Sequence, residues 1–316
     1  MRSSNRISFS DHFISDPHLE RSWGGVFYHP AFIEPACEVL KLEGNTAYVT
    51  CDENQIGATN LVRRNRFPFR ISSLPLLFQY FGPILFDLSR NAFVLEALDE
   101  FLSNSCDFAY LSFPPDIGSL DGLTNWKIIP NVTLALKEDG LKRWGADFKD
   151  DVKNKIRKAT REKVEIIESD NLPRELWKTA YGRRGMQPPI SSVALSIWCE
   201  KLVGASLLRI FTARIRGEDI AFRGELIYGK FAYDWIAGSS PAFHSSGANQ
   251  LLMAEIGKEL SALGISTWDM VGGEIPSIAD FKRSFGAVDV PYFQASRAFG
   301  IKGKAFELLR KIRHGR

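Results

Sequence analysis

Apolar and polar positions alternate along the chain in two patterns, one typical of helices and one typical of strands. Apolar residues return every three or four positions in residues 93–103 and 248–263, which predicts helices there. Strict alternation follows the turn at Gly44 and predicts a strand over residues 45–51. Both patterns are mixed along the whole length, so the sequence predicts an α/β (α+β) fold with mixed sheets flanked by helices.

One strongly apolar stretch, residues 71–86, fits neither pattern. Pro75, Gly82 and Pro83 interrupt it, and neither a continuous helix nor a central strand accommodates them easily. We therefore expect a buried loop or a wall that faces a substrate.

The second half of the chain shows a longer ordered series of elements. Turn signals at Arg216-Gly217 and Gly229-Lys230 join three strand-like segments, which predicts three consecutive antiparallel strands. The full predicted series is a strand at 164–168, helices at 174–184 and 193–203, strands at 207–216, 218–228 and 230–237, a helix at 248–263, a strand at 266–270, a helix at 277–285 and a strand at 292–299.

Composition narrows the class of protein. With 316 residues, 45% of them hydrophobic, the chain is long enough for two cores. Its net charge is only +3, so no global field favours nucleic acid or an anionic membrane, and any anion site must be local.

The four cysteines form no CxxC pair, and no apolar run marks a signal peptide or a membrane span, which favours a cytoplasmic protein. No GxSxG, HExxH or Walker pattern occurs, and the histidines form no metal set, so we expect neither a metal nor a hydrolase.

Three segments carry a resemblance to a known family. They are the basic helix DDVKNKIRKA (150–159), the strand YDWIAG (233–238), and WDMVGG (268–273) followed by FKRSFG (281–286). Together with the order of elements, they resemble the Fem-type aminoacyl transferases and the related bacterial GNAT-like acetyltransferases. The resemblance implies two GNAT-like domains, which we place at residues 1–144 and 145–316, the second with a basic C-terminal tail.

The resemblance also implies a catalytic site in the second domain. Lys282 lies between Phe281 and Phe285, whose i, i+4 spacing can anchor the short helix while Lys282 serves as an anion or oxyanion clamp. A solvated surface lysine is the alternative. Asp269 ends a strand before a glycine turn and either orients an amine or caps the turn. Tyr233 and Asp234 are further candidates, although Tyr233 is equally consistent with the core.

Two features could bind phosphate. Ser246 and Gly247 open the helix predicted at 248–263, where free amide groups and the helix dipole favour an anion, but simple capping of the helix is an equal alternative. The CoA pyrophosphate loop of ordinary GNAT enzymes is incomplete in this segment. Lys153, Arg157 and Arg161 share one face of the basic helix and either hold a phosphorylated acceptor or RNA backbone, or form a solvated face.

These expectations combine into one leading function and one alternative. The leading function is transfer of an acyl or aminoacyl group to an amine of an envelope, polysaccharide or peptide precursor, with acyl-CoA or aminoacyl-tRNA as the donor co-substrate. The alternative is a non-catalytic GNAT-like protein that binds a phosphorylated glycan or lipid. Partners are then a small-molecule or precursor substrate, and tRNA where the donor is aminoacyl-tRNA. Residues 301–316, rich in Lys and Arg beside apolar residues, are a possible contact with a membrane surface.

Overall fold

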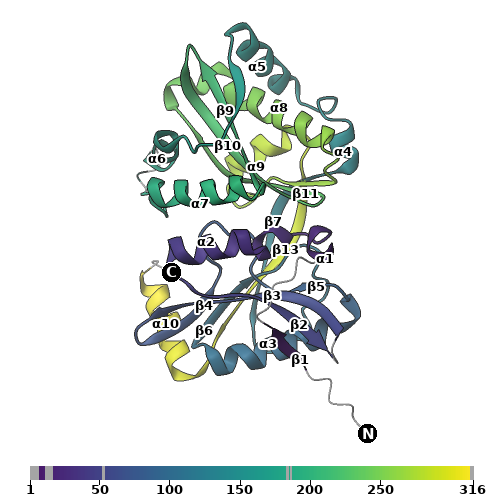
Figure 1. Cartoon of the computed structure of the whole chain (residues 1–316), viewed down its shortest axis with the longest axis vertical. Coiled ribbons are helices and arrows are strands. Elements are labelled where there is room, and N and C mark those ends of the chain that lie inside the picture. The colour runs from purple at the N-terminus through teal and green to yellow at the C-terminus, as the bar shows by residue number, and fades with distance from the viewer. Residues whose placement is uncertain (1–6, 11–16, 52–53, 183–184, 186, 314–316) are drawn as a thin grey trace. The chain divides into compact units, whose positions relative to one another are not determined.

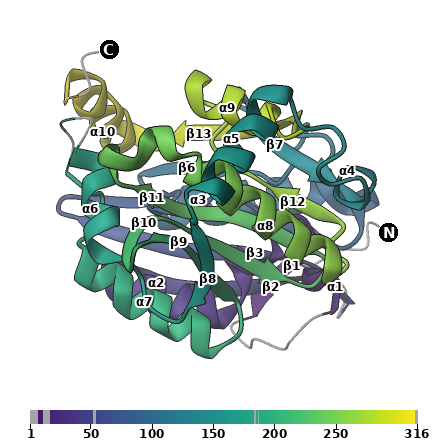
Figure 2. The same cartoon turned by 90° about the horizontal axis from the view of Figure 1, so that it is seen from above.

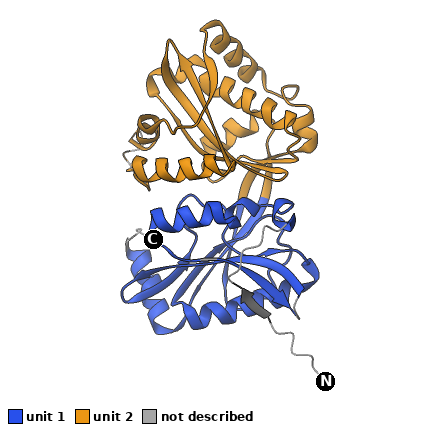
Figure 3. Cartoon of the chain, in the orientation of Figure 1, with its two compact units in different colours: residues 1–131, 291–316 blue, residues 132–290 orange. Residues whose placement is uncertain are grey.

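The computed structural model describes residues 7–10, 17–51, 54–182, 185 and 187–313. The chain forms two compact units, and Figure 3 colours them separately: unit 1 comprises residues 1–131 and 291–316, and unit 2 comprises residues 132–290. Two long strands, β7 (Lys127–Lys137) and β13 (Val288–Ala298), carry the chain from one unit to the other.

This division differs from the predicted domains, 1–144 and 145–316. In β7, Leu136 pairs with Trp268 of unit 2, so the residues just before 144 already belong to that unit. In β13, Ala295 pairs with Leu111, so the end of the chain returns to unit 1. The prediction assumed that each domain is continuous in sequence, and long-range strand pairing overrides that assumption.

Unit 2 is built on one mixed sheet. Its strands lie in the order β7-β12-β11-β10-β9-β8. The consecutive strands β9, β10 and β11 are antiparallel to one another, as predicted, and β11 is parallel to β12. The bounds are β8 Glu165–Ser169, β9 Leu208–Ile215, β10 Glu218–Tyr228, β11 Phe231–Ser239 and β12 Thr267–Asp269.

Helices cover both faces of this sheet (Figures 1 and 2). On one face α8 (Ala248–Ala262) packs against β9 and β10, and α5 (Asp150–Arg161) packs on α8. On the other face lie α6 (Arg174–Gly182) and α7 (Ser192–Gly204). The remaining helices are α4 (Glu138–Lys142), α9 (Pro276–Arg283) and the 3-10 turn Pro241–Ser246. The core between the sheet and α8 includes Trp268 and the buried side of that helix. The predicted series of elements in this half is confirmed, except that residues 183–184 of the helix predicted at 174–184 lie outside the described residues.

Unit 1 also has a mixed sheet, in the order β1-β2-β3-β4-β6-β13, with β5 paired to β3. Only β4 and β6 are parallel among these pairs of described strands. The strands are β1 Ile7–Ser10, β2 Glu43–Cys51, β3 Asn54–Arg66, β4 Phe69–Ser73, β5 Ile84–Leu85 and β6 Phe108–Ser112. The helices are α1 Pro17–Glu20, α2 Pro30–Leu40, α3 Asn91–Ser105 and α10 Gly300–Arg313, with 3-10 turns at Gly25–Tyr28 and Leu88–Arg90.

Two stretches of unit 1 differ from expectation. The long strand β3 was not predicted, because its Asn, Gln and Arg residues hide the alternation of a strand. The apolar stretch 71–86 is a buried irregular segment only in its middle, where Phe78, Tyr80 and Phe81 are buried, and its ends belong to β4 and β5.

Residues 301–313 of the basic C-terminal segment belong to α10, and residues 314–316 lie outside the described residues. The Phe306 ring of α10 packs on Phe69 and Phe108. Within the described residues, no helix has both the length and the apolar character to cross a membrane.

Candidate functional site

A cavity of about 680 Å³ opens within unit 2. Another pocket of the same unit, beside Trp144 and Phe285, has only about 180 Å³. The large cavity, called here the unit 2 cavity, is bounded by the second half of β11, the loop after β12, α9, the end of α6 and the start of α8.

The pairing of β11 explains why a cavity forms here. Its parallel pairing with β12 ends at Tyr233 and Asp269, whereas β11 continues to Ser239. On the other edge, Gly224 pairs with Ile236 and Glu225 with Asp234, so Trp235 is an extra, bulged residue. A bulge redirects side chains, and both Asp234 and Trp235 consequently line the cavity.

Asp234 is the centre of a buried ion-pair network. Nη1 of Arg223 lies 2.6 Å from each carboxylate oxygen, and Nζ of Lys282 lies 2.8 Å from Oδ2. Burial alone would raise the pKa of Asp234, but the positive charges of Arg223 and Lys282 outweigh it and lower that pKa below its ordinary value. Asp234 is therefore a carboxylate that positions two cations on the cavity wall.

Lys282 is only 4% exposed and lines the cavity. Besides Asp234, its ammonium donates to the carbonyl oxygens of Met270 and Val271. An ammonium has three N–H groups, so all of them have acceptors. The alternative of a solvated surface lysine is therefore wrong. The contact between Phe281 and Phe285 that was expected to anchor this helix is confirmed, with ring centroids 5.2 Å apart.

Arg223, which the sequence analysis missed, offers the free donor. Its side chain is buried, lines the cavity and lies over the ring of Phe281, 5.5 Å from the centroid. Its Nε–H is buried and has no hydrogen-bond partner among the described residues. A buried unpartnered donor beside a cavity favours an acceptor atom of a ligand. The signal in the sequence was Arg223 and Glu225 at alternate positions of an otherwise apolar strand.

Glu225 lies behind the cavity wall, next to Asp234 in the sheet. Burial raises the pKa of Glu225 well above its ordinary value, and the nearby charge of Asp234 adds to the rise. Its Oε2 accepts a hydrogen bond of 2.8 Å from Nε1 of Trp268, and no described residue contacts Oε1 by a hydrogen bond. Within the cluster, Arg223 and Lys282 both pair with the carboxylate of Asp234.

Asp269 holds the turn that forms one rim of the cavity. Its Oδ1 accepts hydrogen bonds from Thr133 at 2.6 Å and from the N–H of Val271 at 2.9 Å. Val271 has φ 57°, which is unusual for a β-branched residue, and the turn continues through Gly272 at φ 64°. Both Asp269 and Lys282 stabilise this turn: Asp269 accepts from the amide N–H of Val271, and Lys282 donates to the carbonyl oxygen of Val271. Of the two roles predicted for Asp269, orienting an amine or capping the turn, these contacts correspond to capping the turn.

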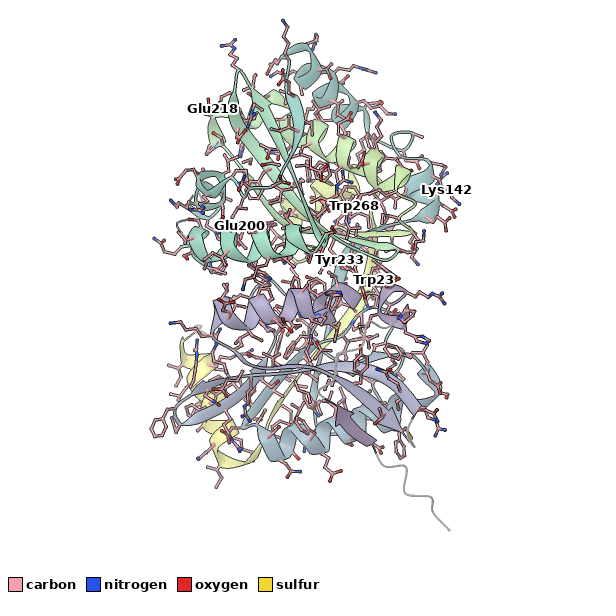
Figure 4. The ribbon with its side chains drawn as sticks, in the orientation of Figure 1. Trp23, Lys142, Glu200, Glu218, Tyr233 and Trp268 are labelled. Carbon is pink, nitrogen blue, oxygen red and sulfur yellow. The ribbon has the colours of Figure 1, made fainter. Side chains whose placement is uncertain are left out.

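Tyr233 is completely buried and is not part of the cavity wall. Figure 4 shows Tyr233 and Trp268 inside unit 2, whereas Lys142 and Glu218 project from it. The structure therefore gives Tyr233 a place in the core, beside the proposed site.

Ser246 and Gly247 form the start of α8. The Ser246 hydroxyl accepts from the N–H of Ala248 at 3.2 Å and donates to the carbonyl of Phe243 at 2.6 Å. Gly247 has φ 79°, and a Cβ there would meet the carbonyl oxygen of Lys155 in α5 at 2.2 Å. Packing and capping thus account for both residues. The cavity instead contacts the neighbouring His244, Asn249 and Gln250.

The predicted phosphate face of α5 lies outside the unit 2 cavity. Nζ of Lys153 donates to the carbonyl of Ala146 at 3.3 Å, and Nη1 of Arg157 donates to Asn154 at 3.0 Å. Arg157 and Arg161 are exposed. The structure does not bring this face together with Lys282, so any ligand phosphate held there would belong to a donor or acceptor larger than the cavity. Among the described residues, no group of His, Cys, Asp and Glu has the arrangement of a metal site.

Comparisons with known proteins give a family match for part of the chain and several similar folds. Residues 146–283 match the model of the acetyltransferase (GNAT) domain family. The fold is similar to that of FemX, with a TM-score of 0.72, 12% identity, and 96% of this chain and 99% of that chain covered. A tandem GNAT protein from the clavulanic acid biosynthesis pathway gives a TM-score of 0.55 at 9% identity, covering 93% and 99%. The C-terminal domain of a putative lysylphosphatidylglycerol synthetase from Agrobacterium fabrum gives 0.57 at 11% identity, covering 81% and 86%. A sequence search of the curated proteins gives no match.

Proposed function

We propose that this chain, a Fem-type, GNAT-like protein whose two units share the fold of FemX and of tandem GNAT proteins, is an acyl or aminoacyl transferase that acts on an amine. The observation that carries the proposal is the unit 2 cavity itself. It lies where β11 separates from β12, and the Arg223–Asp234–Lys282 network forms its wall.

The end of β11 is suited to an extended donor. From Asp234 to Ser239 the strand runs along the cavity beyond its pairing with β12, so a ligand could lie beside it as a short strand. An acyl chain with amide groups, such as the pantetheine arm of CoA, can pair there as a short strand. The aromatic and apolar part of the lining, which includes Trp235 and Phe281, would cover its carbon atoms.

The reaction joins the acceptor nitrogen to the acyl carbon and breaks the bond from that carbon to the donor sulfur or oxygen. The amine attacks in its unprotonated form. Once bonded to the acyl carbon, the nitrogen carries one proton too many, and this proton passes to the departing group or to water as the tetrahedral intermediate collapses. The protein must align the two reactants and stabilise the oxyanion. We assign the second task to Arg223, because its side chain lines the cavity and its buried Nε–H has no hydrogen-bond partner among the described residues. Lys282 and Asp234 position Arg223 and the Val271 turn.

The identity of the donor divides the proposal into two versions. Acyl-CoA fits within a cavity of about 680 Å³ when only its arm enters. Aminoacyl-tRNA would insert its aminoacyl end and place its backbone phosphates outside, where Lys153, Arg157 and Arg161 offer positive charge. We favour an envelope, polysaccharide or peptide precursor as the acceptor, in keeping with FemX and the lysylphosphatidylglycerol synthetase among the similar folds.

A single experiment tests both versions. The full chain is incubated with radiolabelled acetyl-CoA or with tRNA charged with a labelled amino acid, each in the presence of cell-envelope precursors. We expect label to move to an amine in one of the two donor series. If both donors bind but no label moves to any acceptor, the non-catalytic binding protein becomes the better description.

A further inference from the structure

The C-terminal helix α10 has one face that packs against the sheet of unit 1. Phe306 lies 5.3 Å from the ring of Phe69 and 5.2 Å from that of Phe108, measured between centroids. The guanidinium of Arg310 lies over the Phe108 ring at 5.4 Å, and Gly303, on the same side of the helix, is buried. This packed face uses the aromatic and small residues of the helix.

The opposite face of α10 is apolar and exposed. Ile301, Ala305, Leu308 and Ile312 follow one another at i, i+4, i+7 and i+11, with Leu309 beside them, so they form one stripe along the helix. Ile301 is 89% exposed, Leu308 59%, Leu309 54% and Ile312 70%. Single exposed apolar residues are normal, but a continuous stripe of large aliphatic side chains marks an interaction surface. These five residues are called the α10 stripe.

Positive charge borders the α10 stripe on both sides. At about 100° per residue, Lys304 and Lys311 flank one side and Lys302 flanks the other. Glu307, the single acidic residue of the helix, lies toward the packed face and pairs with Lys311 at 3.2 Å. The exposed face thus combines aliphatic side chains with cations and presents no unpaired carboxylate.

A neighbouring hairpin has the same chemistry. Phe67, at the tip between β3 and β4, is fully exposed, and Arg66 and Arg70 lie close to it in sequence. Phe69, two residues further along, is the residue that contacts Phe306 of α10. Figure 1 shows α10 beside β4 and β6 in this unit.

We infer that the α10 stripe docks unit 1 on the surface of an anionic lipid bilayer. Aliphatic side chains enter the boundary between headgroups and acyl chains, while the flanking lysines meet the negative headgroups. A second copy of the chain fits less well, because pairing two stripes would bring lysines against lysines. An RNA partner would use the cations but would leave the aliphatic side chains without a function, since RNA sites use aromatic stacking.

The test uses the full chain and vesicles of two compositions. Sedimentation with vesicles of phosphatidylglycerol and phosphatidylcholine is compared with sedimentation with phosphatidylcholine alone. We expect binding to the anionic vesicles to be on the order of tenfold stronger than binding to phosphatidylcholine alone. Because about three flanking lysines attract the negative headgroups, this binding should weaken when the salt concentration is raised to about 0.5 M. The double variant Leu308→Ser/Ile312→Ser should lose about tenfold in binding, because two membrane-facing side chains are removed.

A matched control comes from α7, where Val193 and Ile197 form an exposed apolar pair at i, i+4. The variant Val193→Ser/Ile197→Ser should bind vesicles as the unchanged chain does. Circular dichroism checks that both double variants stay folded. The proposal is overturned by a folded chain that does not sediment with anionic vesicles, or by equal losses in the two variants. A concentration-dependent dimer that only Leu308→Ser/Ile312→Ser abolishes would assign the stripe to self-association instead, and binding to RNA without binding to vesicles would also overturn it.

Discussion

Nζ of Lys282 lies 2.8 Å from Oδ2 of Asp234, and both side chains are almost completely buried. The pair joins α9 to β11 across the wall of the unit 2 cavity. A lysine on a short helix is usually a surface charge. In this unit it is part of the framework that holds Arg223 and the Val271 turn in place.

Replacing Lys282 by Met should therefore cost stability as well as activity. The substitution leaves Asp234 with Arg223 as its single cationic partner among the described residues. We expect a loss of roughly 3 kcal/mol in the free energy of unfolding, together with a fall in transfer on the order of a hundredfold. Urea unfolding and a transfer assay measure the two effects. Lys258→Met on α8, where the lysine is exposed, is the control and should change stability by less than about 0.5 kcal/mol.

Arg223→Lys separates the free donor from the ion pair. Lysine keeps a positive charge for Asp234 but lacks the Nε–H and the planar fork of arginine. We expect a folded protein whose transfer rate or donor affinity falls by about tenfold to a hundredfold, because a donor to the oxyanion or ligand is lost. Arg209→Lys on the adjacent strand is the control, since Arg209 is likewise an ion-paired arginine, with Glu168 and Glu259 as its partners. Equal effects of the two substitutions would remove Arg223 from the site.

The raised pKa of Glu225 predicts how the free energy of unfolding depends on pH. Its pKa is raised in the folded protein, so the stability it contributes is present at pH below its unfolded value and is lost as pH rises through the folded value. The substitution Glu225→Gln removes the titrating group, so the variant does not lose this stability as pH rises. The free energy of unfolding of the variant, relative to the unchanged chain, should increase as pH rises above about 4.5. Urea unfolding between pH 5 and 9, for example, measures it, with Glu218→Gln as the control for removing one exposed carboxylate; a pH-independent difference would contradict a raised pKa.

The basic face of α5 distinguishes the two donors. Changing Lys153, Arg157 and Arg161 to Glu should weaken binding of charged tRNA steeply and reduce the slope of log affinity against log salt by roughly 0.9 for each lost phosphate contact. Binding of acetyl-CoA in the unit 2 cavity should change little. Filter binding over a range of salt measures the tRNA slope. Unchanged tRNA affinity at low salt would leave α5 as a solvated surface.

The second half of the chain was predictable because its signals are local. Turns at Arg216-Gly217 and Gly229-Lys230 define the three antiparallel strands, and the spacing of Phe281 and Phe285 defines the end of α9. The network around Asp234 was not predictable, because Arg223 and Lys282 are far apart in sequence and meet only through the pairing of β10 with β11 and the packing of α9. The boundary near residue 131 was missed for the same reason, since it depends on which strand β7 joins.

The passage of the chain through β7 and β13 also sets the order in which the protein is made. Unit 2 is complete once residue 290 leaves the ribosome, whereas the sheet of unit 1 still lacks β13 and its covering helix α10. Domains generally fold as units during synthesis. The first half of unit 1 must therefore wait, partly assembled, while unit 2 folds. A nascent chain that stalls shortly after residue 290 would carry a complete unit 2 and an incomplete unit 1.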